Sequence, residues 1–273
     1  MSESGYDDRL KPRLIECVRK HYVTPNLLRV TFSCDDLIGF PADKNGGLIK
    51  LFFANRETGI LELPWREGDR ICWPKNKPVS RAYTVRKYRP ESNELDIDFV
   101  AHGLESPGSG WAMRCEPGDV IGLAGPGGPD PLLTPADWHI LAGDLSSLPA
   151  ISAILEELPE EAQGYTFIEV DSPDDEHPLA HPSGIEVCWL VREPSKDPLP
   201  LLTAISQVAP PQGVTSVSAF VAGENASVVA CRNKLIADYQ LKKKSLYAIP
   251  YWKRGKDEEK YHEERHEIMD EEY

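Results

Sequence analysis

The sequence predicts two domains in tandem, an antiparallel β-barrel followed by an α/β domain built on a parallel sheet. The chain has 273 residues, which suits two modest domains at roughly 150 residues each. Short strand-like segments with glycine and proline turns fill the first half, whereas strands alternate with helical spacing in the second. With 41% hydrophobic and 27% charged residues, the composition is that of an ordinary globular protein.

The first half shows the alternation of strands that bury one face. Apolar and polar residues alternate with period two in 28–32 and in 95–99. Further strands are expected at 48–55, 80–88 and 120–125. Repeated short strands between glycine and proline turns are typical of an antiparallel barrel.

The pattern changes after 125–137, a segment rich in glycine and proline. Four apolar strands are predicted beyond it, at 138–143, 165–170, 185–191 and 217–223. Helical spacing follows the first of these strands at Leu148, Ile151, Leu155 and Leu158, and follows the last at Val228, Leu235, Ile236 and Tyr239. Strands alternating with helices imply βαβ units and a parallel sheet.

Three segments are therefore expected. Residues 1–130 form the barrel domain, 131–255 form the α/β domain, and 256–273 form an acidic C-terminal helix or tail. The last segment carries three basic and nine acidic side chains, so it cannot bury a core of its own.

The charge of the chain excludes some partners. Thirty Lys and Arg stand against 44 Asp and Glu, a net charge of −14 that repels phosphate backbones and anionic lipid headgroups. We expect no nucleic acid partner and no stable membrane association. The N-terminal residues lack the pattern of a signal peptide, which predicts a cytoplasmic protein. The six cysteines are scattered without a CxxC pair, so we expect reduced, mostly buried thiols.

One strand places a cation beside an aromatic ring. Period two puts Arg81 and Tyr83 on the same face of the segment 80–86, where they suit a flat anionic cofactor. A cation–aromatic pair on a surface strand is the alternative. Downstream, Asp98, Val100 and His102 alternate on a second strand and lead into 104–112.

A glycine-rich turn follows this second strand. Gly108, Ser109 and Gly110 allow close backbone approach. Ser109 is expected to cap a helix that starts near Trp111, whose N–H donors suit a phosphate.

An ordered set of motifs gives these fragments a common context. RAYT, DFVAHG, PGSGWA, AGPGG, GDLSSLPAI, AGE and YWKRG follow one another along the chain. Together they resemble the siderophore-interacting proteins, a flavin-dependent branch of the ferredoxin-reductase superfamily, from about residue 12 to residue 255. The resemblance implies a ferredoxin-reductase-like fold, with FAD bound by the barrel and NADH or NADPH by the α/β domain.

The resemblance also implies roles for residues of the barrel. Tyr83 packs against the isoalloxazine, Thr84 lies near its reactive nitrogen, and Arg81 neutralises the pyrophosphate. The FAD-binding set implied in this domain is Arg81, Ala82, Tyr83, Thr84, Asp98, Phe99, Val100, His102, Gly108, Ser109, Gly110, Trp111 and Ala112.

The second domain departs from the usual dinucleotide fingerprint, because 143–148 reads GDLSSL and not GxGxxG. The resemblance implies that Asp144 and Ser146 face the flavin and the nicotinamide, with Asp144 and Thr84 as the catalytic pair. A strand-to-helix turn capped by Asp144 or Ser146 is the alternative. The acids of 169–171 favour NADH and Arg192 favours NADPH, so the donor stays NADH or NADPH, with ferredoxin as a possible substitute.

For the substrate, the resemblance implies a ferric siderophore. Lys50, Lys253 and Arg254 correspond to the basic cluster that this family places beside the flavin; solvated surface charges are the alternative. The function implied is a ferric-siderophore reductase that uses NAD(P)H and FAD to reduce iron(III) to iron(II) and release it. The alternatives are a non-catalytic siderophore-binding protein and a general NAD(P)H:flavin reductase or diaphorase.

Two histidine patterns resemble metal sites. Residues 262–266 match the HExxH motif but lie in the acidic segment, without an apolar stripe or an obvious third ligand. His177 and His181 have the same spacing, but Pro178 and Pro182 disfavour a continuous helix. No metal site is expected.

Overall fold

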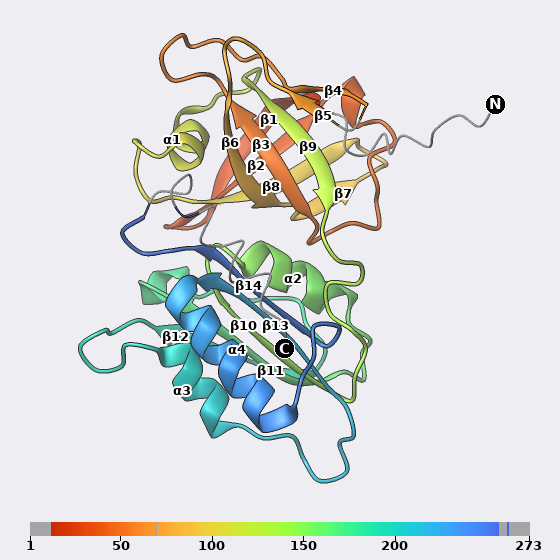
Figure 1. Cartoon of the computed structure of the whole chain (residues 1–273), viewed down its shortest axis with the longest axis vertical. Coiled ribbons are helices and arrows are strands. Elements are labelled where there is room, and N and C mark those ends of the chain that lie inside the picture. The colour runs from red at the N-terminus through yellow and green to blue at the C-terminus, as the bar shows by residue number, and fades with distance from the viewer. Residues whose placement is uncertain (1–11, 69, 257–260, 262–273) are drawn as a thin grey trace, which may run out of the picture. The chain divides into compact units, whose positions relative to one another are not determined.

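The computed structural model describes residues 12–68, 70–256 and 261. The chain divides between Pro129 and Asp130 into two compact units (Figure 1). The predicted fold class is confirmed, since the first unit is an antiparallel, barrel-like sheet and the second a parallel sheet with helices. Among the described residues, no helix combines the length and apolarity that a membrane crossing requires.

In the described part of the first unit, seven strands form one sheet in the order β6-β3-β9-β1-β2-β8-β7, and each neighbouring pair is antiparallel. These strands are β1 (Arg13–Thr24), β2 (Leu27–Ser33), β3 (Leu48–Phe53), β6 (Val79–Thr84), β7 (Lys87–Arg89), β8 (Glu94–Val100) and β9 (Val120–Gly127). The remaining elements are the hairpin β4 (Trp65–Glu67) and β5 (Arg70–Cys72), the 3₁₀ turn η2 (Asp35–Leu37) and helix α1 (Pro107–Arg114).

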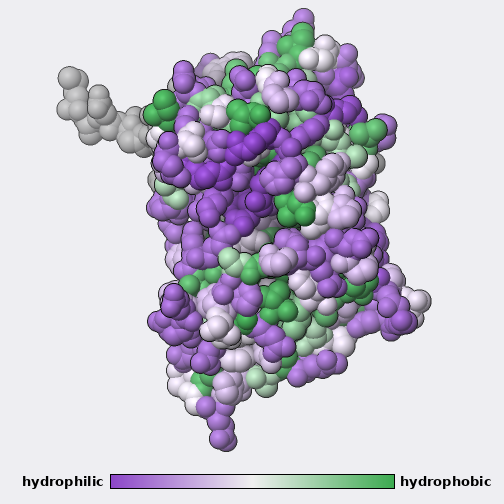
Figure 2. Space-filling model, turned by 180° about the vertical axis from the view of Figure 1, so that it is seen from behind, coloured by the Kyte–Doolittle hydropathy of each residue, from purple (hydrophilic) through white to green (hydrophobic). Residues whose placement is uncertain are grey.

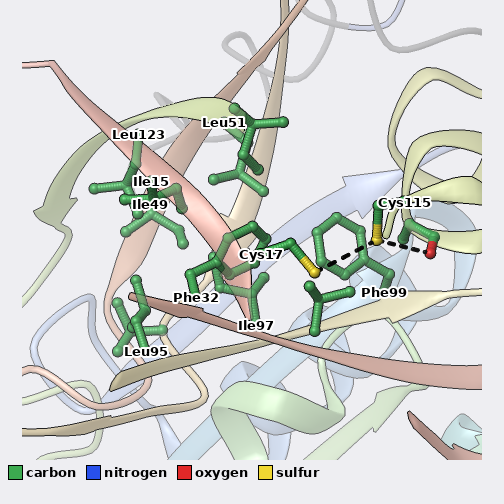
Figure 3. Close-up of a cluster of buried hydrophobic side chains, with 14 of the residues drawn as sticks. Ile15, Cys17, Phe32, Ile49, Leu51, Leu95, Ile97, Phe99, Cys115 and Leu123 are labelled. Carbon is green, nitrogen blue, oxygen red and sulfur yellow. Dashed lines mark hydrogen bonds between the residues drawn. The ribbon is translucent and has the colours of Figure 1, made fainter. Parts of the chain in front are cut away.

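The core of this unit follows from the alternation along its strands. Figure 3 shows the apolar side chains that the strands turn toward one another. Phe32, Ile97 and Phe99 are fully buried, and each buried side chain of this size contributes about 1.5–3 kcal/mol of burial free energy. Cys17 and Cys115 lie in the same cluster with their Sγ atoms 3.9 Å apart. All six cysteines are free thiols, three of them buried and three partly exposed.

In the second unit, the parallel sheet has the order β12-β11-β10-β13-β14 among the described residues. Its strands are β10 (Trp138–Asp144), β11 (Gln163–Val170), β12 (Gly184–Val191), β13 (Val217–Glu224) and β14 (Leu246–Trp252). Its helices are α2 (Leu148–Glu157), α3 (Pro200–Gln207) and α4 (Asn225–Tyr239), with the 3₁₀ turn η3 (Pro173–Asp175).

The helices cover both faces of this sheet. Leu141 and Phe220 pack with Ile151 of α2 on one face, whereas Ile140 and Val221 belong to the cluster that α3 and α4 cover on the other. The strand order reverses between β10 and β13, because the chain adds strands first on one side of β10 and then on the other. Ligands of doubly wound sheets bind outside the carboxyl ends of the strands at such a reversal.

Both predicted helices are confirmed. Leu148, Ile151 and Leu155 are buried on α2, and Val228 and Leu235 on α4. On the face of the molecule drawn in Figure 2, hydrophilic residues predominate and hydrophobic residues form small separate groups, as the composition suggests.

Candidate functional site

Strand β6 carries the RAYT segment. Its register with β3 pairs Arg81 with Leu51 and Tyr83 with Ile49, so both side chains share one face of the sheet, as the alternation predicts. The Tyr83 ring lies 4.5 Å from the ring of Phe99 on β8, at 47°. Arg81 donates from Nη1 to the carbonyl of Ser80 at 2.8 Å. A half-buried aromatic ring and a guanidinium therefore stand on one strand face.

The first turn of α1 lies against this ring. A Cβ added to Gly108 would lie 1.9 Å from the Tyr83 hydroxyl oxygen, so a side chain there would have to displace the tyrosine. A Cβ on Gly110 would lie 2.0 Å from the carbonyl oxygen of Leu104. Glycine is therefore required at both positions by close approach of other atoms.

Ser109 does not cap a helix near Trp111, and that expectation was wrong. Helix α1 starts at Pro107 with Ser106 as its N-cap residue, because proline fits the first helical position. The Ser109 hydroxyl instead accepts from the His102 amide at 3.0 Å and donates to the Gly103 carbonyl at 2.9 Å. It thus ties the segment after β8 to α1.

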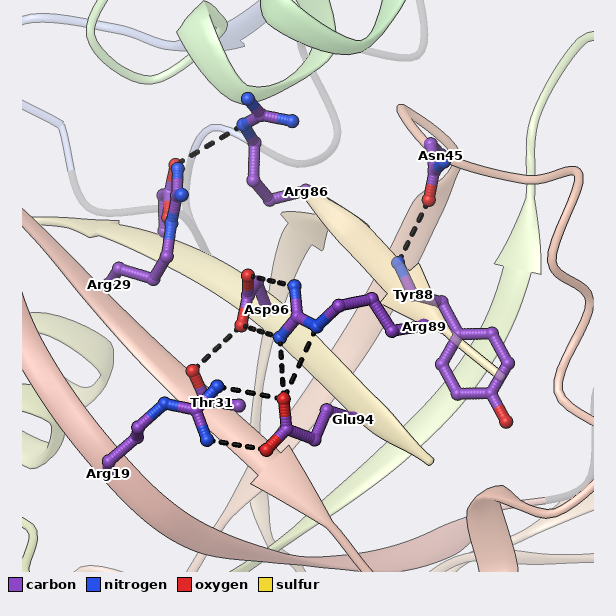
Figure 4. A network of polar contacts seen from close by, with 10 residues as sticks. Arg19, Arg29, Thr31, Asn45, Arg86, Tyr88, Arg89, Glu94 and Asp96 are labelled. Carbon is purple, nitrogen blue, oxygen red and sulfur yellow. Dashed lines mark hydrogen bonds and ion pairs between the residues drawn. The ribbon is translucent and has the colours of Figure 1, made fainter. Parts of the chain in front are cut away.

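Other members of the predicted FAD set are committed to packing or pairing. Asp98 accepts two hydrogen bonds from Arg29, at 2.6 and 2.8 Å (Figure 4 shows Arg29 and its surroundings). Trp111 stacks on Phe32 at 5.8 Å and 15°. Phe99 and Ala112 are fully buried in the core. Of these side chains, Phe99 contacts the Tyr83 ring directly.

Lys50 lies on β3 directly opposite Ala82 of β6. Its side chain is exposed, and the register places it on the face of the sheet opposite to Arg81 and Tyr83. The structure therefore brings Lys50 next to the RAYT strand, although Lys50 and Ala82 are 32 residues apart in the sequence.

This part of the first unit fits a flavin dinucleotide. The half-buried Tyr83 offers a ring for stacking, and Arg81 offers a cation for a pyrophosphate. The first turn of α1 contains no acidic residue, and Gly108 lets its backbone pack directly against the Tyr83 hydroxyl.

In the second unit, Asp144 ends strand β10 at the reversal of strand order. Its Oδ1 accepts from the Ser146 amide at 2.9 Å and from the Ser146 hydroxyl at 2.5 Å. Its Oδ2 accepts from the Glu224 amide at 2.9 Å and from the Trp252 indole Nε1 at 2.8 Å. One carboxylate thus joins the ends of β10, β13 and β14.

Glu224 holds the neighbouring segments. Its Oε2 accepts from the Ala226 amide at 2.6 Å and so caps α4. Its Oε1 accepts from the Arg254 amide at 3.2 Å, and the Arg254 guanidinium lies 5.3 Å from the centre of the Trp252 ring.

A second carboxylate stands beside Asp144. Glu169 on β11 is the register partner of Asp144, and burial together with the Asp144 charge raises the pKa of Glu169 to about 7. Burial also raises the pKa of Asp144. Arg192 at the end of β12 contacts Glu169 at 3.4 Å and Asp171 at 3.0 Å. Strongly perturbed carboxyls at a sheet edge are typical of functional sites.

The histidine pattern at 262–266 lies outside the described residues. His177 and His181 are described, and their Nδ1 atoms lie within hydrogen-bond distance of backbone carbonyls. In the part of the chain that the structure describes, His, Cys, Asp and Glu form no group that would hold a metal ion.

Two family models match nearly the whole chain. The model described as siderophore-interacting FAD-binding domain matches residues 16–130, and the model described as siderophore-interacting protein matches residues 136–255. The chain belongs to the siderophore-interacting protein family. The predicted resemblance is confirmed.

Several relatives of this family member are known. The chain is 60% identical to the ferric vibriobactin reductase ViuB of Vibrio cholerae, over 97% of this chain and 98% of ViuB. It is 30% identical to the NADPH-dependent ferric-chelate reductase of Escherichia coli, over 67% of this chain and 73% of that protein. The crystal structure of the siderophore-interacting protein SipS from Aeromonas hydrophila superposes with a TM-score of 0.85, at 33% identity, over 96% of this chain and 100% of that one.

The sequence alone predicted no role for three residues near Asp144 and the YWKRG segment, namely Trp252, Glu224 and Tyr261. Trp252 and Glu224 lie inside the quoted motifs YWKRG and AGE, which were the available signal. Tyr261 lies in the acidic C-terminal segment, yet it is 1% exposed and donates from its hydroxyl to Asn225 Oδ1 at 2.8 Å. No pattern in the sequence marked it.

Proposed function

We propose that the protein is a ferric-siderophore reductase that uses FAD and NADH or NADPH to reduce siderophore-bound iron(III) to iron(II). The observation that carries this proposal is the arrangement of Tyr83, whose half-buried ring packs against the Gly108 backbone of α1 and shares a strand face with Arg81. The ferric vibriobactin reductase that shares 60% of its residues with this chain supports the same activity.

The first unit binds FAD. Tyr83 would stack against the isoalloxazine, Thr84 would lie beside its reactive nitrogen, and Arg81 would neutralise the pyrophosphate. The turn at Gly108 to Ala112 and the segment from Asp98 to His102 would hold the phosphates and the adenosine. When bound, FAD accepts a hydride from the nicotinamide and passes single electrons to iron(III).

The second unit binds the nicotinamide nucleotide at the carboxyl edge of its sheet, where the strand order reverses. Asp144 and Ser146 belong to this site. The acids at the end of β11 and Arg192 lie where the second strand of a doubly wound sheet usually meets the adenosine ribose. The E. coli relative that is named NADPH-dependent supports a nicotinamide donor over the alternative donor, a ferredoxin.

The substrate is an anionic ferric chelate that Lys50, Lys253 and Arg254 attract. The net charge of −14 repels such a chelate at long range, so local cations are needed to bind it. Iron(II) is less charged and softer than iron(III), and oxygen-rich chelators therefore hold it more weakly and release it. The reaction takes place in the cytoplasm, where NADH and NADPH are available.

Anaerobic spectroscopy of the purified protein tests this proposal. Reconstitution with FAD gives a flavin absorption band, which NADH or NADPH bleaches and a ferric catecholate chelate restores. A protein that binds the chelate but never bleaches supports a non-catalytic binder. A protein that stays colourless after reconstitution rules out the reductase.

Lys50→Ala separates a siderophore reductase from a general diaphorase. The variant loses ferric-chelate reduction while it retains reduction of an uncharged quinone acceptor, because only the anionic chelate needs the cation. Lys75→Ala, an exposed lysine of the same unit, is the matched control and keeps both activities. Ferric-chelate reduction that stays at the wild-type level in Lys50→Ala supports the diaphorase.

A further inference from the structure

We propose that Asp144 is a positioning residue, and that with Trp252 and Glu224 it fixes the two cations of the YWKRG segment, Lys253 and Arg254. We call this trio the Asp144 latch. The inference rests on the proposed function in one respect, since it takes Lys253 and Arg254 as the groups that meet the ferric chelate.

The Asp144 carboxylate is saturated by four hydrogen bonds, two on each oxygen, at 2.5 to 2.9 Å. Three of the four donors are N–H groups, which cannot accept a proton in return. The arrangement therefore suits a carboxyl group whose two oxygens are both engaged by neighbouring segments. A side chain with this surrounding acts by holding its neighbours in place.

Trp252 transmits the position of Asp144 to Arg254. Its indole N–H donates to Asp144 across 108 residues of sequence, and its ring carries the Arg254 guanidinium 5.3 Å from its centre. A guanidinium that lies over an indole ring is attracted to the face of that ring. Holding the indole in place therefore favours the Arg254 conformations that keep the guanidinium over it.

Glu224 provides a second attachment for the same segment. Its amide donates to Asp144, and its carboxylate accepts from the Arg254 amide and from the first turn of α4. The backbone at Arg254 is thereby attached to the end of β13 and to the start of α4. Rotation of the 252–254 segment would break contacts on both sides.

Lys253 is held from another direction. Its Nζ lies 6.0 Å from the centre of the Tyr261 ring, and Tyr261 donates from its hydroxyl to Asn225, the first residue of α4. Lys253 and Arg254 are therefore both linked by contacts to the start of α4. Lys253 is linked through Tyr261, and Arg254 through Glu224.

This arrangement matters for an anionic ligand because lysine and arginine side chains lose rotamer freedom when they bind. Cations that are already confined lose less of it, which improves the affinity for the ligand. The latch thus predicts weaker chelate binding when the indole N–H is removed, by a larger factor than any change in NAD(P)H binding.

Trp252→Phe is the variant that removes this N–H and keeps an aromatic ring. We expect the KM for a ferric catecholate chelate to rise about tenfold, and by a larger factor than the KM for NADH. Trp138→Phe is the matched control, because Trp138 is a tryptophan of the same unit whose buried Nε1 has no hydrogen-bond partner among the described residues. An unchanged KM in Trp252→Phe, or an equal rise in Trp138→Phe, overturns the latch.

A spectroscopic measurement tests the latch apart from the activity. The chain has six tryptophans, and Trp252→Phe identifies the ¹⁵N indole resonance of Trp252 by its loss. In Asp144→Asn, this resonance shifts and its proton exchanges faster with water, while the other five stay in place and show that the fold persists. An unchanged Trp252 resonance overturns the latch. A wild-type protein that never reduces the chelate refutes the proposed function and leaves this measurement valid.

Discussion

Carboxylates on the strands of the two units have pKa values shifted in opposite directions. In the first unit, Glu94 and Asp96 lie on one strand and are paired with Arg19 and Arg89 (Figure 4). Hydrogen bonds from Arg19 lower the pKa of Glu94 to about 2. At the carboxyl ends of the strands in the second unit, burial and the Asp144 charge raise the pKa of Glu169 to about 7.

The direction of the pKa shift distinguishes carboxylates that stabilise the fold from carboxylates that belong to the candidate site. Paired carboxylates in the barrel are ionised in the folded state more readily than in the unfolded state, so they stabilise the fold at neutral pH. Desolvated carboxylates at the sheet edge are ionised less readily and destabilise it there. A destabilising carboxylate of this kind is typical of a functional site. The carboxyl ends of β10 and β11 are therefore the better candidate for chemistry.

Arg89→Met breaks the barrel side of this comparison and has the largest expected effect. It removes the bidentate partner of Asp96, which is 5% exposed, and leaves Thr31 as its remaining hydrogen-bond donor among the described contacts. The free energy of unfolding falls by on the order of 2 to 4 kcal/mol at pH 7, measured by urea denaturation.

Arg19→Met is the control for this loss. The Arg19 side chain is 51% exposed, so its ion pair with Glu94 is screened by water and its loss costs below about 1 kcal/mol. Equal losses in the two variants show that burial does not set the strength of these pairs.

Gly108→Ala tests the candidate site of the first unit. This site depends on the close packing of Gly108 against Tyr83, whereas the site of the second unit depends on carboxylates. The added Cβ lies 1.9 Å from the Tyr83 hydroxyl and displaces that ring. Overpacking of this kind costs about 1–3 kcal/mol, part of which appears as weaker FAD retention, by about tenfold in Kd. Equilibrium dialysis with absorbance at the flavin band measures it.

Gly127→Ala, on β9 of the same unit, is the matched control. A Cβ at Gly127 meets no atom within 4 Å, so the substitution leaves flavin retention as it is in the wild type. If Gly108→Ala binds FAD as tightly as Gly127→Ala does, the flavin does not depend on the contact of α1 with Tyr83.

The fold was predictable where side chains alternate or recur clearly. The strands around Phe32 and Ile97 and helices α2 and α4 follow from periodicity alone. Strand β1 was not predicted, since its sequence RLIECVRKHYVT buries few apolar side chains and gains its stability from pairing with β2 and β9. Strand β14 contains Pro250, which obscures its pattern.

The site was predictable only in part, because its contacts join distant segments. The same-face placement of Arg81 and Tyr83 follows from period two within one strand. The bond from Trp252 to Asp144 spans 108 residues, and no local pattern encodes such a pairing. Motif order supplied the family, but tertiary structure was needed to show which side chains of those motifs meet.

Glu169→Gln breaks the sheet-edge side of the comparison, with the smallest expected effect. The folded pKa of Glu169, about 7, lies above the ordinary value of 4.5, so the wild type loses stability as pH rises from 4.5 to 7. Glutamine carries no such charge, and the stability of the variant relative to wild type therefore increases by on the order of 1 kcal/mol between pH 5 and pH 8. Urea denaturation at both pH values measures it. Glu193→Gln removes an exposed carboxylate that pairs with Lys196 and shows no such increase. A Glu169→Gln variant that loses stability on alkalinisation in parallel with the wild type would show that Arg192 neutralises Glu169 fully, and the contrast between the two units would then disappear.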